Sequence, residues 1–521
     1  MSVEHVQART GGYADSVTLM AVSARAQAVD GVEVALVAMA TQLNLDLLDG
    51  LGLAAPPGAG EHDLLVAIKA ADSDSLSVAL AIVDEELKTR PGGGREHDGW
   101  QQSPRTTASA AARVGPGIAL ISVPGQYAFA EALDALNADC DVMIFSDNVP
   151  VEQEVKLKEI AAERDLLVMG PDCGTAIVGG VGLGFANSVR RGPVGVVAAS
   201  GTGAQQLTCL IELAGVGVSA VLGVGGRDLS AAVGGRSARA ALAALDADLA
   251  TELIVLLSKP PAGAVADELR EFAAGLTTPV QFALLGPGQP DLTETAQNVL
   301  RAVGAPVPSW PSWRPARALP HDAAATGPAE PRRDQREVTP GRTGFLRGLF
   351  AGGTLCDEAM VIAAQRLGPI YSNVPLEPSW RIDPRTAAGL AAQAGRHVMI
   401  DFGEDELTAG RPHPMIDQRL RLDRLAAEAA DPATAVIMLD VVLGYGAHPD
   451  PADELAQAIA EAKAGRPELE VVVSLIGTPT DPQGLVEQAA ELASAGAHVF
   501  ASNATAARFA CGLITSGNGG N

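Results

Sequence analysis

The clearest indication of the fold is the stretch VGVVAASGTG at residues 194–203. A run of β-branched and small apolar residues stops at Ser200, and a helical pattern follows it. A second stretch of the same kind, GFLRGLFAGGT, occupies residues 344–354. A strand that passes through a glycine-rich turn into a helix leaves unpaired backbone N–H groups at the helix N-terminus, and these suit a phosphate or a carboxylate. Two such turns predict an anion-binding enzyme built from repeated α/β units.

Apolar runs and amphipathic helical stretches alternate on both sides of these turns. The sequence predicts strands at 115–123, 141–145, 166–169, 194–198, 218–224, 253–257, 280–285, 345–350, 397–400, 435–442, 470–476 and 498–501. Short strands separated by longer helices are typical of parallel, doubly wound sheets of the Rossmann-like or flavodoxin-like kind. Such sheets bind their ligands at the carboxyl ends of the strands, where the loops lie.

Two stretches without periodicity divide the chain. Residues 91–113 are polar and Gly-rich, and residues 306–342 hold many prolines and mixed charges, so both are interpreted as linkers. We expect a small N-terminal α+β domain at 1–90, a Rossmann domain at 114–191, and two flavodoxin-like domains at 192–305 and 343–521. The length of 521 residues agrees with this division, because domains usually hold ~100–200 residues each.

The composition of the chain limits the classes of molecule that it is expected to bind. The net charge of −25 argues against nucleic acid, which needs a basic surface, but helix termini and a few arginines can still bind a small anion. No apolar run approaches the ~20 residues of a membrane span, and the first residues, MSVEH, lack the pattern of a signal peptide. The five cysteines are scattered without a Cys-x-x-Cys spacing, which indicates reduced thiols and no metal site. We therefore expect a cytoplasmic protein.

The two turns and neighbouring loops supply the expected anion-binding groups. These are Ser200, Gly201, Thr202, Gly203, Gly225, Gly226, Lys259, Gly352, Gly353 and Thr354. A simpler interpretation is available for several of them, because Ser200 can merely cap a helix and glycines can serve tight turns.

Four further residues are the candidate catalytic groups. Arg227 and Arg411 are candidate cations, and His413, between two prolines, is the candidate acid–base group or oxyanion donor. Asp440 ends an apolar strand, where it either caps the next turn or orients a catalytic cation. Arg227 can alternatively form a surface ion pair with Asp228, and such a pair contributes only ~0–1 kcal/mol.

Longer strings resemble a known family. MGPDCG at 169–174, ASGT at 199–202 and GVGGRD at 223–228 resemble the α subunit of succinyl-CoA synthetase. Further strings extend the similarity to the FdrA family, which joins that α-like half to a β-carboxyl-like half: DSVTLM at 15–20, FSDN at 145–148, SKPP at 258–261, AGGT at 351–354 and GRPHPMID at 410–417. The resemblance implies a succinyl-CoA synthetase-like architecture, with a CoA-binding-like domain at 114–191, an α-like domain at 192–305 and a β-carboxyl-like domain at 343–521.

The resemblance also implies a function. The FdrA family is associated with bacterial purine (allantoin) catabolism and resembles a subunit of an oxamate-type carbamoyltransferase, which converts oxalurate and phosphate to oxamate and carbamoyl phosphate. It implies small anionic substrates (phosphate, carbamoyl phosphate and an α-oxo acid amide), partner subunits and no cofactor. A phosphohistidine relay like that of succinyl-CoA synthetase is not expected, because residues 192–305 contain no His and the position of its orienting Glu falls on Gln206.

Two functions of other classes stay open. An NDP-forming acyl-CoA synthetase would bind CoA in the second domain and would need a phosphohistidine. A non-catalytic scaffold or regulatory subunit would use the same pockets only to hold a ligand or a partner.

Overall fold

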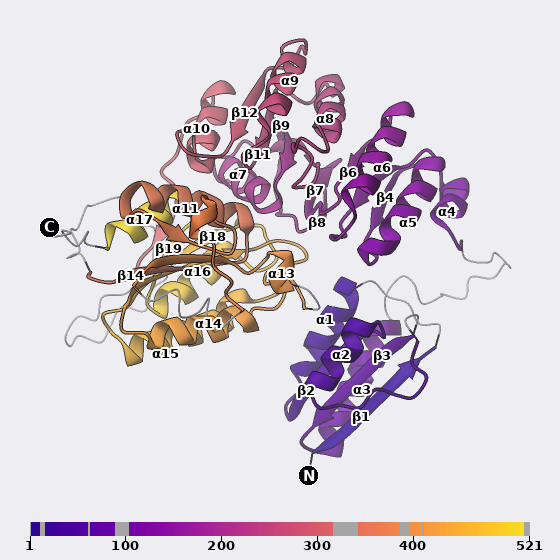
Figure 1. Ribbon diagram of the computed structural model, residues 1–521, viewed down its shortest axis with the longest axis vertical. Helices are drawn as coiled ribbons and strands as arrows, with labels where there is room; N and C mark the ends of the chain where they lie inside the picture. Colours follow the sequence, from indigo (N-terminus) through magenta and orange to yellow (C-terminus); the bar gives the residue numbers. More distant parts are fainter. Residues whose placement is uncertain are drawn as a thin grey trace.

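The structure, a computed structural model, describes residues 2–10, 16–60, 63–88, 104–315, 342–385, 395–408 and 411–514. Within these residues one small sheet is antiparallel, and three further sheets are wholly or mainly parallel and flanked by helices (Figure 1). The predicted α/β fold with several doubly wound sheets and a small N-terminal unit is therefore confirmed. No described helix combines the length and the apolar character that crossing a bilayer requires.

The N-terminal unit is a three-stranded antiparallel sheet of order β1-β3-β2, drawn in indigo in Figure 1. Its elements are β1 (Val3–Arg9), α1 (Ser16–Gln27), β2 (Val32–Met39), α2 (Gln42–Gly50), β3 (Leu64–Ala70) and α3 (Ser73–Lys88). The central strand β3 is apolar throughout because both of its faces are covered. Val66 and Ile68 face the core beneath α1 and α3, whereas Leu65 and Ala67 face the core beneath α2.

The next unit is a parallel sheet of order β4-β5-β6. Its elements are α4 (Thr107–Val114), β4 (Ile118–Ile121), α5 (Gly125–Asn137), β5 (Asp141–Ile144), α6 (Val151–Glu163) and β6 (Val168–Met169). The expectation that residues 91–113 form a linker is wrong at its end, because residues 107–113 belong to the helix α4. Thr106 caps this helix by accepting from the Ser109 N–H, and the Ser109 hydroxyl accepts in return from the Thr106 N–H.

A six-stranded sheet of order β12-β11-β9-β10-β7-β8 follows. Its elements are β7 (Thr175–Val178), β8 (Val181–Gly184), β9 (Arg191–Ala199), α7 (Gly201–Leu213), β10 (Val218–Gly223), α8 (Arg236–Ala247), β11 (Leu253–Ser258), α9 (Gly263–Ala273), β12 (Val280–Leu284) and α10 (Leu292–Ala302). The hairpin β7–β8 pairs with β10 and not with β4–β6, so the sheet begins before the boundary expected at residue 192.

The last sheet has seven strands in the order β13-β19-β18-β17-β14-β16-β15. Its elements are β13 (Ser312–Trp313), β14 (Phe345–Phe350), α11 (Gly353–Leu367), β15 (Ile370–Tyr371), a 3-10 turn (Pro378–Trp380), β16 (His397–Asp401), α13 (Asp405–Thr408), α14 (Arg419–Ala430), β17 (Thr434–Val442), α15 (Pro451–Gly465), β18 (Glu470–Ile476), α16 (Leu485–Ser494), β19 (Ala497–Phe500) and α17 (Asn503–Gly512).

One apolar core joins the six-stranded and seven-stranded sheets. Helices α7 and α10 of the first sheet and α11 and α17 of the second bury their apolar faces together in it. Figure 1 shows α7 close to α11 and α17 where the two sheets meet. Because α7 and α11 each begin at one of the glycine-rich turns, this shared core brings the two turns together.

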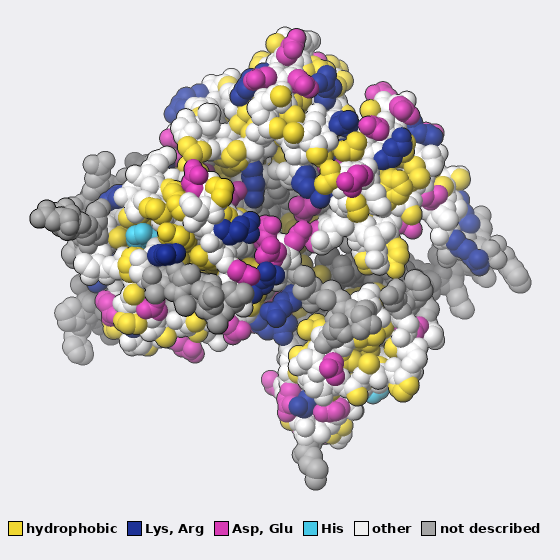
Figure 2. Space-filling view, in the orientation of Figure 1, with side chains coloured by type: hydrophobic (Ala, Val, Ile, Leu, Met, Phe, Trp, Pro, Cys, Tyr) yellow, Lys and Arg dark blue, Asp and Glu magenta, His cyan; other side chains and the backbone are white. Residues whose placement is uncertain are grey.

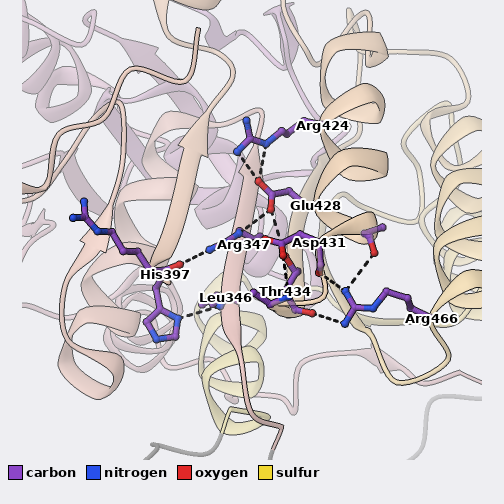
Figure 3. Close-up of polar contacts among 11 residues, drawn as sticks. Leu346, Arg347, His397, Arg424, Glu428, Asp431, Thr434 and Arg466 are labelled. Atoms are coloured by element: carbon purple, nitrogen blue, oxygen red, sulfur yellow. Dashed lines mark hydrogen bonds and ion pairs between the residues drawn. The ribbon is translucent and has the colours of Figure 1, made fainter. Parts of the chain in front are cut away.

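A buried ionic cluster lies at the amino ends of the seven-stranded sheet (Figure 3). Arg347 Nε, in β14, donates to Glu428 at 2.8 Å, and Arg347 Nη2 lies 3.4 Å from Asp431 Oδ2. Beside it the Leu346 N–H donates to His397 Nδ1 at 3.0 Å. Both charges of the Arg347–Glu428 pair are buried and paired, so this cluster fixes α14 on β14 at the edge opposite the glycine-rich turns.

Candidate functional site

The two glycine-rich turns touch each other. Ser200 Oγ accepts from the Gly203 N–H at 3.0 Å, and the same oxygen lies 2.6 Å from Thr354 Oγ1. A Cβ atom on Gly352 would lie 2.9 Å from the Thr202 side chain, and one on Gly203 would lie 3.0 Å from Thr354 Cγ2. The glycines are therefore needed for close approach of two helix N-termini, which together present first-turn N–H groups that have no partner within their helices.

The Asp440 side chain binds two backbone N–H groups of the second glycine-rich turn. Its carboxylate accepts from the Ala351 N–H at 2.6 Å and from the Gly352 N–H at 2.8 Å. It also accepts from Arg421 Nη1 at 2.8 Å, and both side chains of this ion pair are buried. Asp440 thus caps the turn at the start of α11 and not, as was expected, the turn that follows it in the chain, and the cation that it holds is the buried Arg421. These contacts give it a structural role in place of the expected catalytic one. The expectation that the Gly352 amide is open to a ligand is corrected for the same reason.

Lys259 follows β11 and reaches the start of α11. Its Nζ lies 3.1 Å from Asp357 Oδ2 and 3.1 Å from the position of a Cβ atom on Gly353. Burial disfavours the ammonium charge, but the carboxylates of Asp357 and Asp401 outweigh it and raise the pKa of Lys259 above its ordinary value. A permanent cation therefore stands beside the first-turn amides of α11.

His413 contacts the loop that follows β16. Its Nδ1 accepts from the Met415 N–H at 3.2 Å, so the proton of the neutral imidazole belongs on Nε2. Nε2 lies 2.9 Å from the position of a Cβ atom on Gly403. Burial and the nearby Arg421 charge lower the pKa of His413 to about 4. At neutral pH it can donate a hydrogen bond to an oxyanion, but it is not a cationic acid. Arg411, expected beside it, is exposed.

Arg227 belongs to a different contact set. Its Nη2 donates to the Val149 carbonyl at 2.8 Å and lies 3.0 Å from Glu154. Asp228 does not pair with it, since that carboxylate is fully buried, accepts from the Ser237 and Ala238 N–H groups and holds Lys158 at 2.8 Å. The expectation of a surface ion pair between Arg227 and Asp228 is therefore wrong. Arg227 is bound to Glu154 of α6, and its positive charge still opposes the rise in the pKa of Asp172 at the mouth of the site.

The loop carrying Gly225 and Gly226 faces the start of α7. A Cβ atom on Gly225 would lie 2.3 Å from the Pro171 carbonyl, and one on Gly226 would lie 3.7 Å from Asp172 Oδ2. A small polar cleft of only about 10 Å³ is lined there by Asp172, Cys173, Gly174, Thr175, Ala198, Ser200, Gly201, Gly223 and Gly225. The first turn, Gly225 and Asp172 thus share one cleft.

Carboxylates surround the mouth of the site. Burial and the neighbouring Asp405 and Asp147 carboxylates raise the pKa of Asp172 to about 7, while Lys259 and Arg227 oppose this. In Figure 2 acidic side chains gather near α13, at the junction of the two large sheets. An anion must therefore enter against local negative charge, and the helix N-termini and Lys259 are the groups that attract it.

Substitution Asp172→Asn is expected to tighten phosphate binding roughly two- to fivefold at pH 8 and to change it little at pH 6. The wild-type carboxyl is ionised above its pKa of about 7 and neutral below it, so only the higher pH retains the repulsion that asparagine removes. Asparagine also tolerates the φ of 56° found at this residue. Calorimetric titration with inorganic phosphate at both pH values measures the effect, with Asp267→Asn on the exposed face of α9 as the control. Equal tightening at both pH values would contradict this account.

Two residues singled out from the sequence are structural. Gln206 accepts from the Asn503 N–H at 2.9 Å and donates to the Ala501 carbonyl at 3.1 Å, which joins α7 to the start of α17. The Cys173 thiol is fully buried, and burial raises its pKa to about 12. Close packing is thus the observed role of this thiol.

Sequence reasoning missed three carboxylates beside Lys259 and the mouth of the site, namely Asp172, Asp357 and Asp401, and it missed Arg421. Asp401 directly follows the predicted strand at 397–400, and Asp172 lies three residues after the predicted strand at 166–169, so their positions were a usable signal. Asp357 and Arg421 lie within helices, where the sequence pattern does not distinguish them from surface charges.

A larger, mainly apolar cavity of about 610 Å³ lies at the carboxyl end of β4. Its lining residues are Thr107, Ala119, Leu120, Ile121, Ser122, Val123, Glu131, Phe145, Gly184, Phe185 and Gly446. The Phe185 ring lies 5.6 Å from the His413 ring, so one side chain separates this cavity from the polar site.

Comparisons with known proteins agree with this architecture. A family model described as "CoA-ligase" matches residues 349–513, and one described as "AllF, heavy metal-associated domain" matches residues 1–104. The uncharacterized protein YahF of Escherichia coli (strain K12) is 40% identical over 513 residues, which cover 95% of each chain.

More distant similarities involve CoA-dependent enzymes. The α subunit of ADP-forming succinate–CoA ligase from Staphylococcus aureus (strain Mu50) is 28% identical over 181 residues, which are 34% of this chain and 58% of that subunit. A solved structure of dinucleotide-forming acetyl-coenzyme A synthetase 1 from Ca. Korarchaeum cryptofilum, in complex with phosphate and ADP, is 14% identical, with a TM-score of 0.28 over 76% of this chain and 82% of that one.

The residues of the N-terminal domain do not fit the metal that the second family model suggests. Residues 1–104 contain no cysteine, and heavy metals prefer thiolate ligands. Nowhere in the described parts of the chain do three His, Cys, Asp or Glu side chains form a group that could hold a metal ion.

The full chain is therefore expected to bind no Zn²⁺ or Cu²⁺ through this domain. Equilibrium dialysis followed by elemental analysis should give equal metal content for wild type and for His5→Ala, which removes the half-buried imidazole of β1. Loss of one bound metal ion in the variant would show that the domain is a metal site.

Proposed function

Because this chain belongs to the FdrA family of succinyl-CoA synthetase-like proteins, we propose that it transfers an acyl group from a donor to inorganic phosphate. In the favoured case the group is carbamoyl, the donor is oxalurate, and the products are oxamate and carbamoyl phosphate, as in purine catabolism. The observation that carries this proposal is the contact between the two helix N-termini at Ser200 and Thr354, with Lys259 beside them.

The phosphate is held by the groups that the two turns present. In this proposal the first-turn amides of α7, at Gly201 and Thr202, and of α11, at Gly353 and Thr354, donate to the phosphate, and Lys259 supplies a full positive charge. This is the arrangement that binds phosphate at helix N-termini, here doubled. The same donors stabilise the oxyanion that forms when phosphate attacks the acyl carbon. Much of the catalysis then comes from holding two reactants in line.

The chain's own residues support direct attack by phosphate rather than a phosphohistidine relay. Residues 192–305 contain no His, and the Gln206 side-chain amide is engaged by backbone groups of Ala501 and Asn503 at the start of α17. His413, the imidazole nearest the turns, has its Nδ1 engaged by the Met415 N–H and its pKa lowered to about 4. We assign it the role of an Nε2–H donor to the developing oxyanion.

The second candidate function is that of a CoA ligase, in which an acyl-CoA is the donor. The match of residues 349–513 to the CoA-ligase model favours it, and the apolar cavity beside Phe185 offers room for part of CoA. Both candidates share the attack of phosphate on an acyl carbon and differ only in the leaving atom, nitrogen or sulfur. A relative that matches one third of this chain is a subunit of a ligase, so we propose partner subunits here as well.

The test is an assay of acyl-phosphate formation by the chain alone and after co-expression with the products of neighbouring genes. Oxalurate plus phosphate, and succinyl-CoA plus phosphate, are supplied separately, and hydroxylamine traps carbamoyl phosphate as hydroxyurea and succinyl phosphate as its hydroxamate. We expect product from oxalurate without labelling of the protein by radioactive phosphate. A stable acid-labile phosphoprotein would instead establish the relay, and ligand binding without turnover in every complex would establish a scaffold.

A further inference from the structure

Asp401 is held rigidly at the end of β16 and is buried at 2% exposure. Its backbone is fixed on both sides by Asn373, which accepts from the Asp401 N–H at 3.0 Å and donates to the Asp401 carbonyl at 2.8 Å. Its Oδ1 accepts from the Gly403 N–H at 2.8 Å. Oδ2 accepts no hydrogen bond from any residue that the structure describes. One carboxyl oxygen is therefore anchored and the other is available.

The available oxygen points at the proposed phosphate position. A Cβ atom on Gly353 would lie 2.6 Å from Asp401 Oδ2 and 3.1 Å from Lys259 Nζ. The carboxyl oxygen and the ammonium group thus stand on the same side of the first residue of α11. The absence of a side chain at Gly353 is what lets both groups reach the helix N-terminus.

The surroundings of Asp401 allow it both to hold and to release a proton near neutral pH. Burial raises the pKa of this carboxyl to about 7, with Lys259 and the Gly403 N–H opposing the shift and Glu404 and Asp357 adding to it. His413 Nε2 faces it from the opposite loop, since a Cβ atom on Gly403 would lie 2.9 Å from Nε2 and 3.2 Å from Asp401 Oδ1. An acid–base group is most effective when its pKa lies near the working pH.

We propose that Asp401 is the general acid–base catalyst of the reaction, taking the proton from the attacking phosphate and delivering it to the leaving atom. This inference rests on the proposed function. Hydrogen phosphate dianion attacks the carbamoyl carbon of oxalurate, a P–O–C bond forms, and the C–N bond breaks. The phosphate proton passes to Asp401 Oδ2 and then to the departing nitrogen. Oxamate and carbamoyl phosphate dianion result, so atoms and charge balance without any other reactant. With an acyl-CoA donor the same proton goes to the thiolate.

Asp401→Asn tests the role with little change of shape, because the amide oxygen can still accept from the Gly403 N–H. Its kcat with oxalurate is expected to fall about 10²–10⁴-fold, while phosphate affinity measured by calorimetry stays within about threefold. Glu406→Gln, an exposed carboxylate of the neighbouring α13, serves as the control and should keep wild-type kcat. A variant kcat within about threefold of wild type overturns the assignment and leaves the proposed function standing.

The leaving group gives a second, independent readout. A nitrophenyl carbamate needs no proton on its departing phenolate, so Asp401→Asn should lose less than about tenfold with this donor. The wild type alone also decides the point, even if the variant fails to fold. Its kcat should show a larger solvent deuterium isotope effect with oxalurate, whose departing nitrogen takes up a proton, than with the nitrophenyl carbamate, whose phenolate leaves without one. Equal isotope effects with both donors overturn the role of Asp401, whereas no acyl phosphate from any donor or complex overturns the proposed function itself.

Discussion

Replacing Lys259 with alanine is expected to lower kcat/KM for acyl-phosphate formation by about 10²–10³. Its ammonium group places a full positive charge beside the start of α11, 3.1 Å from the Cβ position of Gly353. Its loss also leaves Asp357 and Asp401 without their common cation, and this adds repulsion against an incoming phosphate. Initial rates at several phosphate concentrations measure the effect, and most of it should appear as weaker use of phosphate.

Two further variants make this experiment specific. Lys259→Arg keeps the charge with a bulkier planar head, so it should retain part of the activity. Lys156→Ala removes an exposed lysine of α6 that lies 3.9 Å from Glu159, and it should leave the rate unchanged. A Lys259→Ala enzyme within a factor of about three of wild type would show that phosphate binds elsewhere.

Truncation of Asp440 to alanine is expected to destabilise the seven-stranded domain by about 3–5 kcal/mol. The change leaves the buried Arg421 guanidinium without its carboxylate and leaves the Ala351 and Gly352 N–H groups without acceptors. Hydrogen exchange of amides in β14 and α11 measures the effect locally, which suits a chain of several domains because global unfolding need not be two-state.

A double variant distinguishes the ion pair from simple loss of packing. Adding Arg421→Met to Asp440→Ala removes the unpaired charge, so it should recover at least ~1 kcal/mol of the lost stability. If the two single losses simply add in the double variant, the pair is not coupled, and the structural role given to Asp440 is wrong.

The sequence was sufficient to predict most of the parallel strands, because they are short apolar runs with helical patterns between them, but it did not predict the hairpin β7–β8 or the short strands β13 and β15. The predicted strands at 194–198 and 345–350, for example, lie inside β9 and β14. The expectations of no nucleic acid partner and no metal, which rest on charge and cysteine spacing, stay predictions. These signals are local, and local patterns decide which residues form strands and helices.

The arrangement of the site could not be predicted in the same way. Contact between Ser200 and Thr354 depends on how α7 and α11 pack in the shared core, which no local pattern specifies. Asp440 lies near the end of β17 and Asp401 at the end of β16, yet one carboxylate is bound by a buried arginine and the other has a free oxygen. Only their three-dimensional neighbours distinguish a structural carboxylate from a candidate catalytic one.

A crystal structure of the complex soaked with inorganic phosphate or carbamoyl phosphate tests the central idea most directly. We predict tetrahedral density between the first turns of α7 and α11, within hydrogen-bond reach of Lys259 Nζ and of the Gly353 amide. Density remote from both turns, or covalently attached to a side chain, would contradict the account.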